Sequence, residues 1–346
     1  MDRVEHLIVG AGPAGLRAAQ VLAQAGREVL VLEKHAEVGP KTCAGGLTLK
    51  TMRELKALGL PEGAARPDVG HVAFASGRPL ALHAEVTLIH TIARRSLGQR
   101  QLEWARAAGA EVRAGVPALA IDLAARTVTA GGRPIRWGHL IGADGADSAV
   151  RRALGLPSPR EYFAAEYNVP GIRLEPLRVE CDPRPLANGY FWVFPHSAYT
   201  SLGAVAAKHL VAPAALRRYL DARLDGLGVA RAGVAFEGAT LEVAYHGCHF
   251  PGDVHLVGDA AGVVSSLTAE GIYAALVTGE EVARRILDPR APTPKTASWL
   301  RTKRRHDRLA GWLARPAPRA WTLGALARMA SAPALRRPLA GWFLQA

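Results

Sequence analysis

The sequence predicts an α/β protein in which a parallel sheet, covered by helices, carries an inserted antiparallel sheet and is followed by a helical C-terminal region. Three observations predict this fold. At the N-terminus a strand, a glycine-rich turn, a helix and a second strand follow one another, as in a βαβ unit. Short apolar strands that end in glycine recur at 139–142 and 254–258. Between these strands lie longer strand-like runs broken by Gly and Pro, which indicate an antiparallel sheet.

The elements follow in a clear order. Residues 4–9 run apolar as a buried strand, residues 14–25 have helical periodicity, and residues 28–32 form a second buried strand that ends at Glu33. The later strands divide between the two sheets, with 139–142 and 254–258 in the parallel sheet and 72–74, 81–88, 171–179 and 190–205 in the antiparallel one. We therefore expect a first domain at 1–68, 91–155 and 250–290, a substrate domain at 69–90 and 156–249, and a basic C-terminal region at 291–346 with three helical pieces.

Length and composition agree with two packed domains. The chain has 346 residues, and 49% of them are apolar, which is enough to bury a sizeable core. No run of 18 or more uncharged apolar residues occurs, so we expect no transmembrane helix, and the N-terminus has no signal-peptide pattern. The three cysteines, Cys43, Cys181 and Cys248, are too few and too widely spaced for a disulfide framework. These features favour a reduced, cytoplasmic setting.

Positive charge is concentrated at the C-terminal end. The net charge is +13, and residues 295–346 contain eleven basic residues and one acidic residue, so they carry +10 of it. The segment also contains aromatic residues, a mixture typical of helices that bind an anionic membrane surface; these are Trp299, Trp312, Trp321, Trp342 and Phe343. There are two alternative explanations: an Arg-rich overall composition, or C-terminal helices that pack over the substrate cavity with their arginines in solvent. From the charge and the aromatic residues we expect a peripheral position on the inner membrane face. No nucleic-acid-binding signature is present, so we expect no nucleic-acid partner.

A phosphate-binding turn follows the first strand. In Gly10-Ala11-Gly12-Pro13-Ala14-Gly15, the first glycine permits a tight turn, the second lets the backbone approach a pyrophosphate, and the third lets the helix pack against the strand. The N–H groups at the helix start, including that of Ala14, and the helix dipole then face the phosphates. Glu33 lies 18 residues beyond Gly15, where a carboxylate accepts ribose hydroxyls, and Lys34 follows it. These features predict a dinucleotide site.

Two later segments identify the dinucleotide. Gly142-Ala143-Asp144-Gly145-Ala146-Asp147-Ser148 and Gly258-Asp259-Ala260-Ala261-Gly262 each follow a short apolar strand. With these motifs in this order, the sequence resembles the superfamily of FAD-binding monooxygenases and reductases. The resemblance implies a glutathione-reductase-type Rossmann domain that binds FAD non-covalently. It also implies that Asp259 binds the ribityl and phosphate region and that Asp144 shapes the pocket. Arg94, before an expected helix at 99–108, then approaches FAD, and Val116, on the following strand, lies near the adenine.

Three further segments resemble the geranylgeranyl reductase family, whose members saturate isoprenoid double bonds with reduced FAD. They are Lys41-Thr42-Cys43-Ala44-Gly45-Gly46, Gly189-Tyr190-Phe191-Trp192-Val193-Phe194-Pro195 and Leu267-Thr268-Ala269-Glu270-Gly271-Ile272. In that family a cysteine and a paired glycine lie near the flavin, a Tyr-x-Trp-x-Phe-Pro strand lines the substrate cavity, and a Leu-Thr-x-Glu-Gly-Ile turn follows the aspartate motif. The resemblance covers most of residues 1–290 and implies further flavin contacts at Ala44, Gly45, Gly46, Gly258, Gly271 and Ile272.

An aromatic wall is expected from alternation alone. Tyr190, Trp192 and Phe194 alternate along one strand, so they lie on one face and either line a cavity or pack into a core. His196 follows them at a position where the family commonly has a lysine, and it completes the expected substrate-binding set.

Two features would act at the flavin ring. Cys43 sits in a glycine-rich loop, either as a catalytic proton donor or as a small residue that fits the loop. A helix that begins near Gly271 would point its positive end at the ring and favour the anionic reduced flavin. No metal site is expected, because His246-Gly247-Cys248-His249 has no second pair of ligands elsewhere.

We therefore expect an enzyme that transfers hydride from reduced FAD to a C=C bond of an apolar, isoprenoid (geranylgeranyl-type) substrate. A second G-x-G-x-x-G motif is absent, so the electron donor, NAD(P)H or ferredoxin, binds transiently. The main alternative is a flavin monooxygenase that hydroxylates an apolar aromatic or quinone-like substrate, because the same fold supports both reactions. A flavin-binding protein without turnover is the third interpretation, and the intact flavin motifs argue against it.

Overall fold

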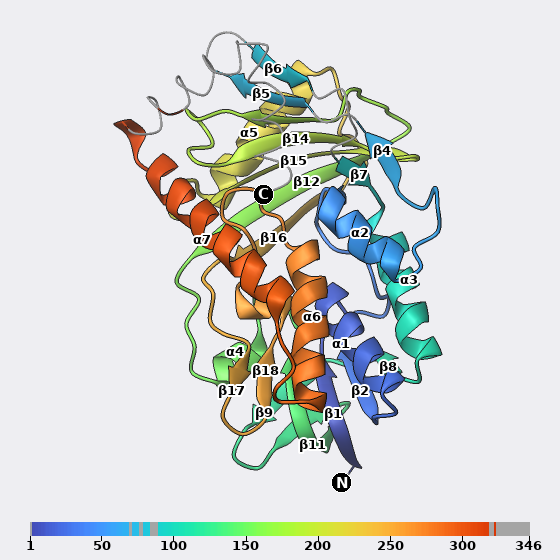
Figure 1. The fold of residues 1–346 in the computed structure, drawn as a ribbon. Helices are drawn as coiled ribbons and strands as arrows, with labels where there is room; N and C mark the ends of the chain where they lie inside the picture. Colours follow the sequence, from blue (N-terminus) through green and yellow to red (C-terminus); the bar gives the residue numbers. More distant parts are fainter. Residues whose placement is uncertain (1, 69–70, 76–78, 84–88, 318–321, 323–346) are drawn as a thin grey trace.

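The computed structural model describes residues 2–68, 71–75, 79–83, 89–317 and 322. Two large sheets lie one above the other, and α6 and α7 run along one side of the molecule (Figure 1). The N-terminal strand belongs to the lower sheet. The chain passes between the two sheets several times, so each sheet collects segments that are far apart in the sequence.

Eight strands form the lower, mixed sheet. Its main path is β17-β18-β11-β1-β2-β8, and β10 and β9 extend it antiparallel from β11. β1 pairs in parallel with β2 and β11, and β11 pairs in parallel with β18, which confirms the strands predicted at 139–142 and 254–258. The strands are β1 Asp2–Val9, β2 Val29–Glu33, β8 Glu111–Ala114, β9 Ala118–Asp122, β10 Thr127–Ala130, β11 Arg133–Gly142, β17 His249–Phe250 and β18 Val254–Leu256.

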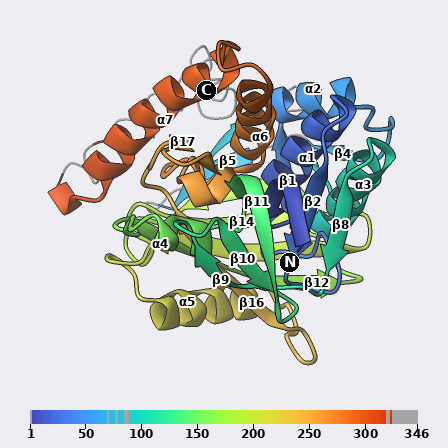
Figure 2. The ribbon, with the colours of Figure 1, turned by 90° about the horizontal axis from the view of Figure 1, so that it is seen from below.

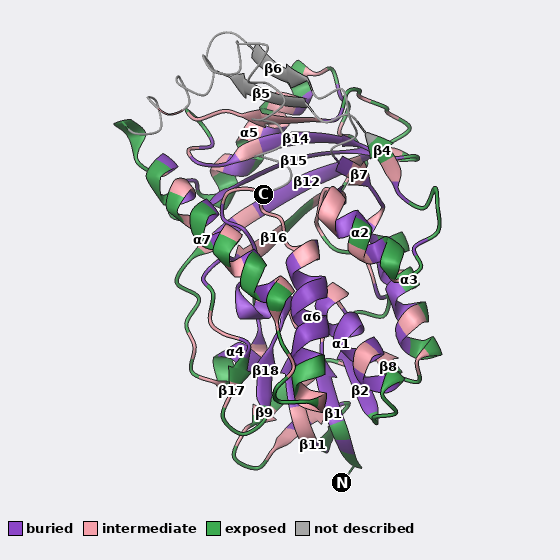
Figure 3. Ribbon diagram, in the orientation of Figure 1, coloured by how far each residue is buried: buried purple, intermediate pink, exposed green. Residues whose placement is uncertain are grey.

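Helices α1 and α6 pack on one face of this sheet at backbone contact. α1 spans Pro13–Gln24 and α6 spans Ile272–Leu287. A Cβ atom on Gly279 would overlap with the carbonyl oxygen of Ala14, and one on Gly258 would lie 2.9 Å from the Cβ of Ala14. Both helices are largely buried (Figure 3). Small residues at the crossing therefore determine how closely the two helices approach.

The remaining helices of this part of the chain are short or peripheral. α3 covers Arg94–Ala107, α4 covers Ala149–Ala153, and a 3₁₀ turn, η1, covers Gly258–Ala261. The sequence placed a helix at 99–108, so its start was wrong by five residues: Arg94 is the first helical residue, not a residue ahead of the helix. The sequence gives no capping residue at this point, and the Ala93 cap makes no side-chain hydrogen bond.

A row of four imidazoles crosses the lower sheet. His6 on β1 stacks on His139 on β11 with ring centroids 5.2 Å apart, and His139 stacks on His255 on β18 at 5.6 Å. His255 also hydrogen-bonds His249 of β17, with 3.0 Å between their Nδ1 atoms. Burial lowers the pKa of all four, and that of His255 falls to about 3. The row is therefore neutral at pH 7.

Seven strands form the upper, mostly antiparallel sheet, in the order β16-β12-β15-β14-β13-β5-β6. Helix α5, Pro213–Gly226, packs on the face away from α1 and α6 (Figure 2). The strand expected at 171–179 is wrong, because most of this run is irregular and only its end joins β13. The sheet instead contains a strand that was not predicted, β12, which pairs with both β15 and β16. The strands are β5 His71–Ala75, β6 Pro79–His83, β12 Glu161–Pro170, β13 Arg178–Cys181, β14 Tyr190–Pro195, β15 Tyr199–Ala207 and β16 Phe236–Glu242.

A separate three-stranded sheet has the order β3-β7-β4. Its strands are Gly46–Thr48, Ile89–Thr91 and Arg66–Asp68, and α2, Leu49–Ala57, follows the first of them. The loop before β3 carries Cys43. The pairing of β3 with β7 therefore fixes the C-terminal end of the loop.

Helix α7, Pro294–Leu313, is the part of the C-terminal region that the structure describes. Its inner face buries Trp299, Lys303 and His306, and Lys303 Nζ donates to the carbonyl of Val243 at 2.6 Å. Of the three helical pieces expected from the sequence, the two beyond α7, including Trp321, Trp342 and Phe343, lie outside the described residues. Among the described helices, none is both long and apolar enough to span a bilayer.

Candidate active site

The glycine-rich turn connects the carboxyl end of β1 to α1. Gly10 has φ +103°, and a Cβ there would lie 2.9 Å from the Cα of Asp144 and even closer to Ala143. A Cβ on Gly15 would overlap with the carbonyl oxygen of Gly10. At Gly12, in contrast, a Cβ would meet nothing within 4 Å. Two of the glycines are thus needed for chain packing, whereas Gly12 faces open space at the uncapped N-terminus of α1, where a phosphate would bind.

Glu33 lies beside this turn at the end of β2. Its Oε2 accepts the N–H of Ala11 at 2.8 Å, and its Oε1 accepts the N–H of His35 at 2.9 Å. These bonds fix the carboxylate, and each oxygen keeps a lone pair for a further donor such as a ribose hydroxyl. Val116 donates its N–H to the Glu33 carbonyl at 2.8 Å, although it lies two residues beyond β8 and not on the strand as expected. Lys34 is exposed next to Glu33.

The two aspartate motifs follow β11, which pairs with β1, and β18, which pairs with β11 on its other side. Asp144 Oδ2 accepts the N–H of Ala149 at 2.7 Å at the start of α4, and burial raises the pKa of Asp144. Asp259 lies in η1, and its Oδ2 forms an ion pair with Lys41 Nζ at 2.9 Å. Lys41 was not among the predicted site residues. It approaches Asp259 from the loop that also carries Cys43, a contact that spacing along the chain does not reveal.

Arg94 is buried at the start of α3, with 8% of its surface exposed. Its Nε has no hydrogen-bond partner among the residues that the structure describes. A buried guanidinium N–H without a partner is costly, so this position suits an anionic ligand. The sequence predicted an FAD contact here, and the burial is compatible with that prediction.

The loop from Lys41 to Gly46 lies against the upper sheet because of its paired glycines. Gly45 has φ +70°, and a Cβ there would overlap with the carbonyl of Ile92. A Cβ on Gly46 would lie 2.5 Å from the ring of Phe194. Above the loop, His196 Nε2 hydrogen-bonds the carbonyl oxygen of Ala44 at 3.0 Å.

The turn before α6 approaches the same region. Gly271 is the N-cap of α6 and makes no side-chain cap, which confirms the predicted helix start. A Cβ on Gly271 would lie 3.5 Å from Oδ1 of Asp259. Ile272, the first residue of α6, and Gly271 line a cavity together with Cys43 and Ala44. The free N–H groups of α6 therefore lie next to Asp259 and the cysteine loop.

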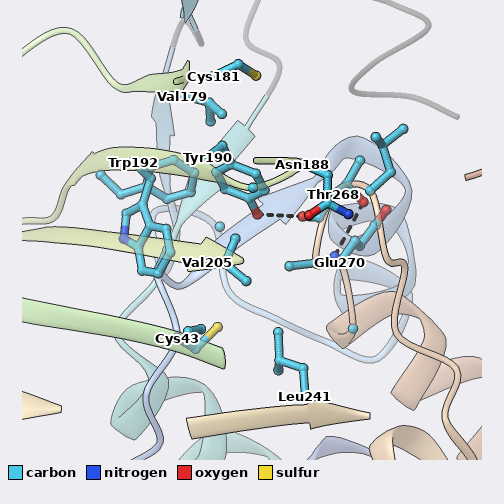
Figure 4. A pocket seen from close by; sticks show the side chains of 18 of the residues that line it. Cys43, Val179, Cys181, Asn188, Tyr190, Trp192, Val205, Leu241, Thr268 and Glu270 are labelled. Carbon is cyan, nitrogen blue, oxygen red and sulfur yellow. Dashed lines mark hydrogen bonds between the residues drawn. The ribbon is translucent and has the colours of Figure 1, made fainter. Parts of the chain in front are cut away.

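That cavity has a volume of about 230 Å³ and an apolar lining. Tyr190, Trp192 and Phe194 all line it, whereas Phe191 and Val193, which alternate with them, pack against α5 on the other face. Figure 4 shows Trp192 and Tyr190 above the cavity, with Cys43 and Leu241 on its opposite side. Tyr190 is held in place by the bond that its hydroxyl donates to the carbonyl of Thr268 at 2.7 Å. The aromatic wall predicted from alternation thus faces a cavity.

His196 does not line this cavity, in contrast to the other residues of the predicted substrate-binding set. Its ring stacks on Tyr199 with centroids 4.4 Å apart and supports the Cys43 loop through the bond to Ala44. Burial lowers the pKa of His196, so the ring is neutral. His196 does not continue the aromatic wall because β14 ends at Pro195, one residue before it.

Two parts of the lining were not among the predicted site residues. Glu270 contributes a carboxylate whose Oε1 accepts the Thr48 hydroxyl at 2.7 Å and whose Oε2 pairs with Lys50 at 3.1 Å. Burial raises the pKa of Glu270, and Lys50 opposes that rise. Leu309 and Leu313 of α7 close another side of the cavity. This position agrees with the alternative stated for the C-terminal helices, which places them over the substrate cavity with their arginines in solvent.

The fold and the site together define an FAD-dependent oxidoreductase. The chain matches the family described as FAD binding domain over residues 3–216 and belongs to it. Within this family it is a member of the geranylgeranyl reductase group, as the resemblance predicted.

Two relatives and a solved structure carry this assignment. Digeranylgeranylglycerophospholipid reductase 1 of Methanopyrus kandleri is 30% identical over 87% of this chain and 84% of its own. Menaquinone reductase of Mycobacterium tuberculosis is 31% identical over 84% of this chain and 78% of its own. A geranylgeranyl bacteriochlorophyll reductase-like protein from Thermoplasma acidophilum shares the fold with a TM-score of 0.78 and 22% identity, over 96% of this chain and 92% of that one. The fold also matches p-nitrophenol 4-monooxygenase of Pseudomonas putida, with a TM-score of 0.73 and 20% identity over 98% and 97% of the two chains.

Proposed function

We propose that this enzyme uses reduced FAD to saturate a C=C bond of an apolar, isoprenoid substrate of the geranylgeranyl type. One observation carries the proposal: an apolar cavity with an aromatic wall begins at the Cys43 loop and at the N-terminus of α6. A cavity of this composition suits a hydrocarbon chain and offers few partners to a polar substrate. The names of the two relatives support the same substrate class.

The residues around the glycine-rich turn fit FAD, in a glutathione-reductase-type arrangement. The open space at Gly12 and the N-terminus of α1 would hold the pyrophosphate, and the fixed Glu33 carboxylate would accept the ribose hydroxyls. The buried Arg94 guanidinium and Lys41, beside Asp259, would offset the phosphate charge. This division of roles assigns residues 1–68, 91–155 and 250–290 to the cofactor domain, residues 69–90 and 156–249 to the substrate domain, and residues 291–346 to the C-terminal region.

When FAD is bound and has been reduced by an external donor such as NAD(P)H or ferredoxin, it would supply a hydride. The protein's own residues would supply the proton, stabilise charge and exclude water. Cys43, whose side chain faces the cavity in Figure 4, would give the proton to the other carbon, either directly or through a water. The N-terminus of α6 would stabilise negative charge on the ring. Leu309, Leu313 and the aromatic wall would exclude bulk water from the reacting bond.

We further propose that α7 rests on an anionic membrane, where prenyl lipids reside. Its inner face closes the cavity through Leu309 and Leu313, and its outer face exposes Arg304, Arg305 and Arg308, as Figure 3 shows for the helix. Trp312 on the same helix is 47% exposed. Arginine and tryptophan on one exposed helical surface favour the headgroup region of a bilayer. The protein would then be cytoplasmic and peripheral on the inner membrane face.

Anaerobic photoreduction tests the reaction. The reduced protein is mixed with a geranylgeranyl lipid under nitrogen, and the return of the oxidised-flavin absorbance is followed together with the mass of the lipid. We expect reoxidation and a gain of two hydrogen atoms in the lipid. Reoxidation by oxygen alone, with a hydroxylated aromatic or quinone product, would favour the monooxygenase, for which the shared fold of p-nitrophenol 4-monooxygenase is the supporting observation.

A further inference from the structure

A buried carboxylate links the cysteine loop to the aromatic wall. Glu166 lies on β12 and is 0% exposed. Its Oε1 accepts the backbone N–H of Cys43 at 2.7 Å, and its Oε2 accepts the hydroxyl of Ser201 at 2.7 Å. The Ser201 oxygen in turn accepts the indole N–H of Trp192 at 2.9 Å. One side chain thus contacts the loop on one side of the cavity and, through Ser201, the wall on the other.

The register of the upper sheet explains why these groups meet. Glu166 on β12 pairs with Gly203 on β15, and Gly203 pairs with Trp192 on β14. A Cβ on Gly203 would overlap with the Trp192 indole, so the ring lies directly on the Gly203 backbone. Ser201, two residues away on β15, shares that face and receives the indole N–H. A glycine at this one position therefore lets the chain of hydrogen bonds form.

The direction of each hydrogen bond is fixed by chemistry. A backbone N–H and an indole N–H donate only, so Ser201 must accept from Trp192 and give its own proton to Glu166. Glu166 then accepts at both oxygens, as an ionised carboxylate does. Burial raises the pKa of Glu166, while the bonds from Ser201 and Cys43 oppose the rise.

Core packing alone does not account for this carboxylate. Ala164, two residues earlier on the same face, lines the cavity as a small apolar side chain. Burying a carboxylate is costly, and replacing buried ionic groups by apolar ones is often neutral or stabilising. A carboxylate at this position is therefore better explained by what it holds than by the stability that it adds.

We propose that Glu166 is a positioning residue that holds the Cys43 loop and the Trp192 indole in a fixed relation across the cavity. Figure 4 shows the two side chains on different sides of the cavity. Any shift of the loop would then move the wall that orients the substrate, so the thiol and the double bond stay aligned. The catalytic role of Cys43 rests on the proposed function, whereas the link between the two side chains does not.

The test uses the full chain and two readouts that need no substrate. Alkylation of Cys43 by iodoacetamide, quantified on its peptide by mass spectrometry, reports on the loop. Solvent exchange of the Trp192 indole N–H, assigned in the NMR spectrum by its absence from Trp192→Phe, reports on the wall. The variant is Glu166→Gln, in which one of the two carboxylate oxygens becomes an NH2 group, so the Cys43 N–H and the Ser201 hydroxyl can no longer each donate to an oxygen of their own. The matched control is Glu242→Gln, because Glu242 lies in the same sheet, is also 0% exposed, also accepts a backbone N–H, and does not line the cavity.

Both readouts should rise about tenfold in Glu166→Gln, the factor that corresponds to the loss of one hydrogen bond, and change less than about twofold in the control. A rise in only one readout, or equal rises in the control, would overturn the proposal. If Glu166→Gln does not fold, Ser201→Ala decides instead. It should speed indole exchange about tenfold and Cys43 alkylation about two- to threefold through the shared carboxylate. Unchanged alkylation in that variant would also overturn the link, whatever the enzyme reduces.

Discussion

Acidification should destabilise the folded protein through His255. This imidazole lies in the middle of the four-histidine row, is 8% exposed, and has its pKa lowered from 6.5 to about 3, first by burial and then by His249 and His139. In the unfolded chain the ring titrates near its ordinary value. Between the two pKa values the unfolded state binds a proton that the folded state does not. Stability is therefore lost as the pH falls below about 6.5, and the loss from this residue ends near pH 3.

The size of the effect follows from this difference. Each pH unit between the two pKa values costs about 1.4 kcal/mol, so from pH 6.5 to pH 5 the free energy of unfolding should fall by about 2 kcal/mol. The figure is the same if the folded pKa is one unit higher, because His255 is still deprotonated at pH 5. The pKa values of His6, His139 and His249 are also lowered, so the loss from the whole histidine row should be larger. Buried carboxyl groups with a raised pKa, such as Glu166 and Glu270, act in the opposite direction, so the comparison with a His255 variant is needed to isolate the effect.

Urea unfolding followed by far-UV circular dichroism at pH 7 and pH 5 measures the effect. The comparison is between the unmodified protein and His255→Asn, which keeps hydrogen-bonding groups but does not titrate. The variant should be less stable at pH 7 but should lose about 2 kcal/mol less on acidification. Equal losses in the two proteins would refute the reasoning, because the titration would then arise elsewhere.

Three further predictions concern function. Gly12→Val should fold, because a Cβ there meets nothing within 4 Å, but it should bind FAD at least about 100-fold more weakly because the side chain blocks the phosphate. The flavin content of the purified variant measures this, with Gly226→Val as the control. FMN in place of FAD in the purified protein would contradict the assignment. Cys43→Ala should keep its flavin and lose about 10²- to 10⁴-fold in turnover, as expected for a positioned proton donor, and unchanged turnover would make Cys43 a structural residue. Replacing Arg304, Arg305 and Arg308 by Glu should reduce sedimentation with anionic vesicles at low salt, since each basic residue contributes about 1 kcal/mol at such a surface, whereas equal binding to neutral and anionic vesicles would contradict the membrane proposal.

The arrangement of the motifs proposed to bind the cofactor could be predicted from the sequence because their signals are local. Each motif is a glycine-rich turn directly after an apolar strand, and parallel strands bring their carboxyl ends to one edge of a sheet. Gly10, Asp144 and Asp259 therefore come together although more than 100 residues separate each from the next. The alternation of Tyr190, Trp192 and Phe194 was equally local.

The remaining features depend on contacts that no spacing records. β12 was missed because the charged residue Glu166 interrupts its buried face. The group that Glu166 binds, the N–H of Cys43, lies 123 residues away in the sequence. Lys41 meets Asp259 across 218 residues. The run at 171–179 was predicted as a strand from its apolar residues, but Pro176 within it provides no backbone N–H for a ladder.

The backbone contact between α1 and α6 has a consequence for the length of the bound molecule. Gly279 touches Ala14 at the start of α1, and α6 begins eight residues before Gly279, at its Gly271 cap. At 1.5 Å per residue, the first turn of α6 lies about 12 Å beyond the crossing. The two helix ends, which we propose to face the phosphate and the electron-accepting ring, are thus held at a set separation by Gly279 and Ala14. A cofactor with a shorter or longer linker between phosphate and ring would reach only one of them.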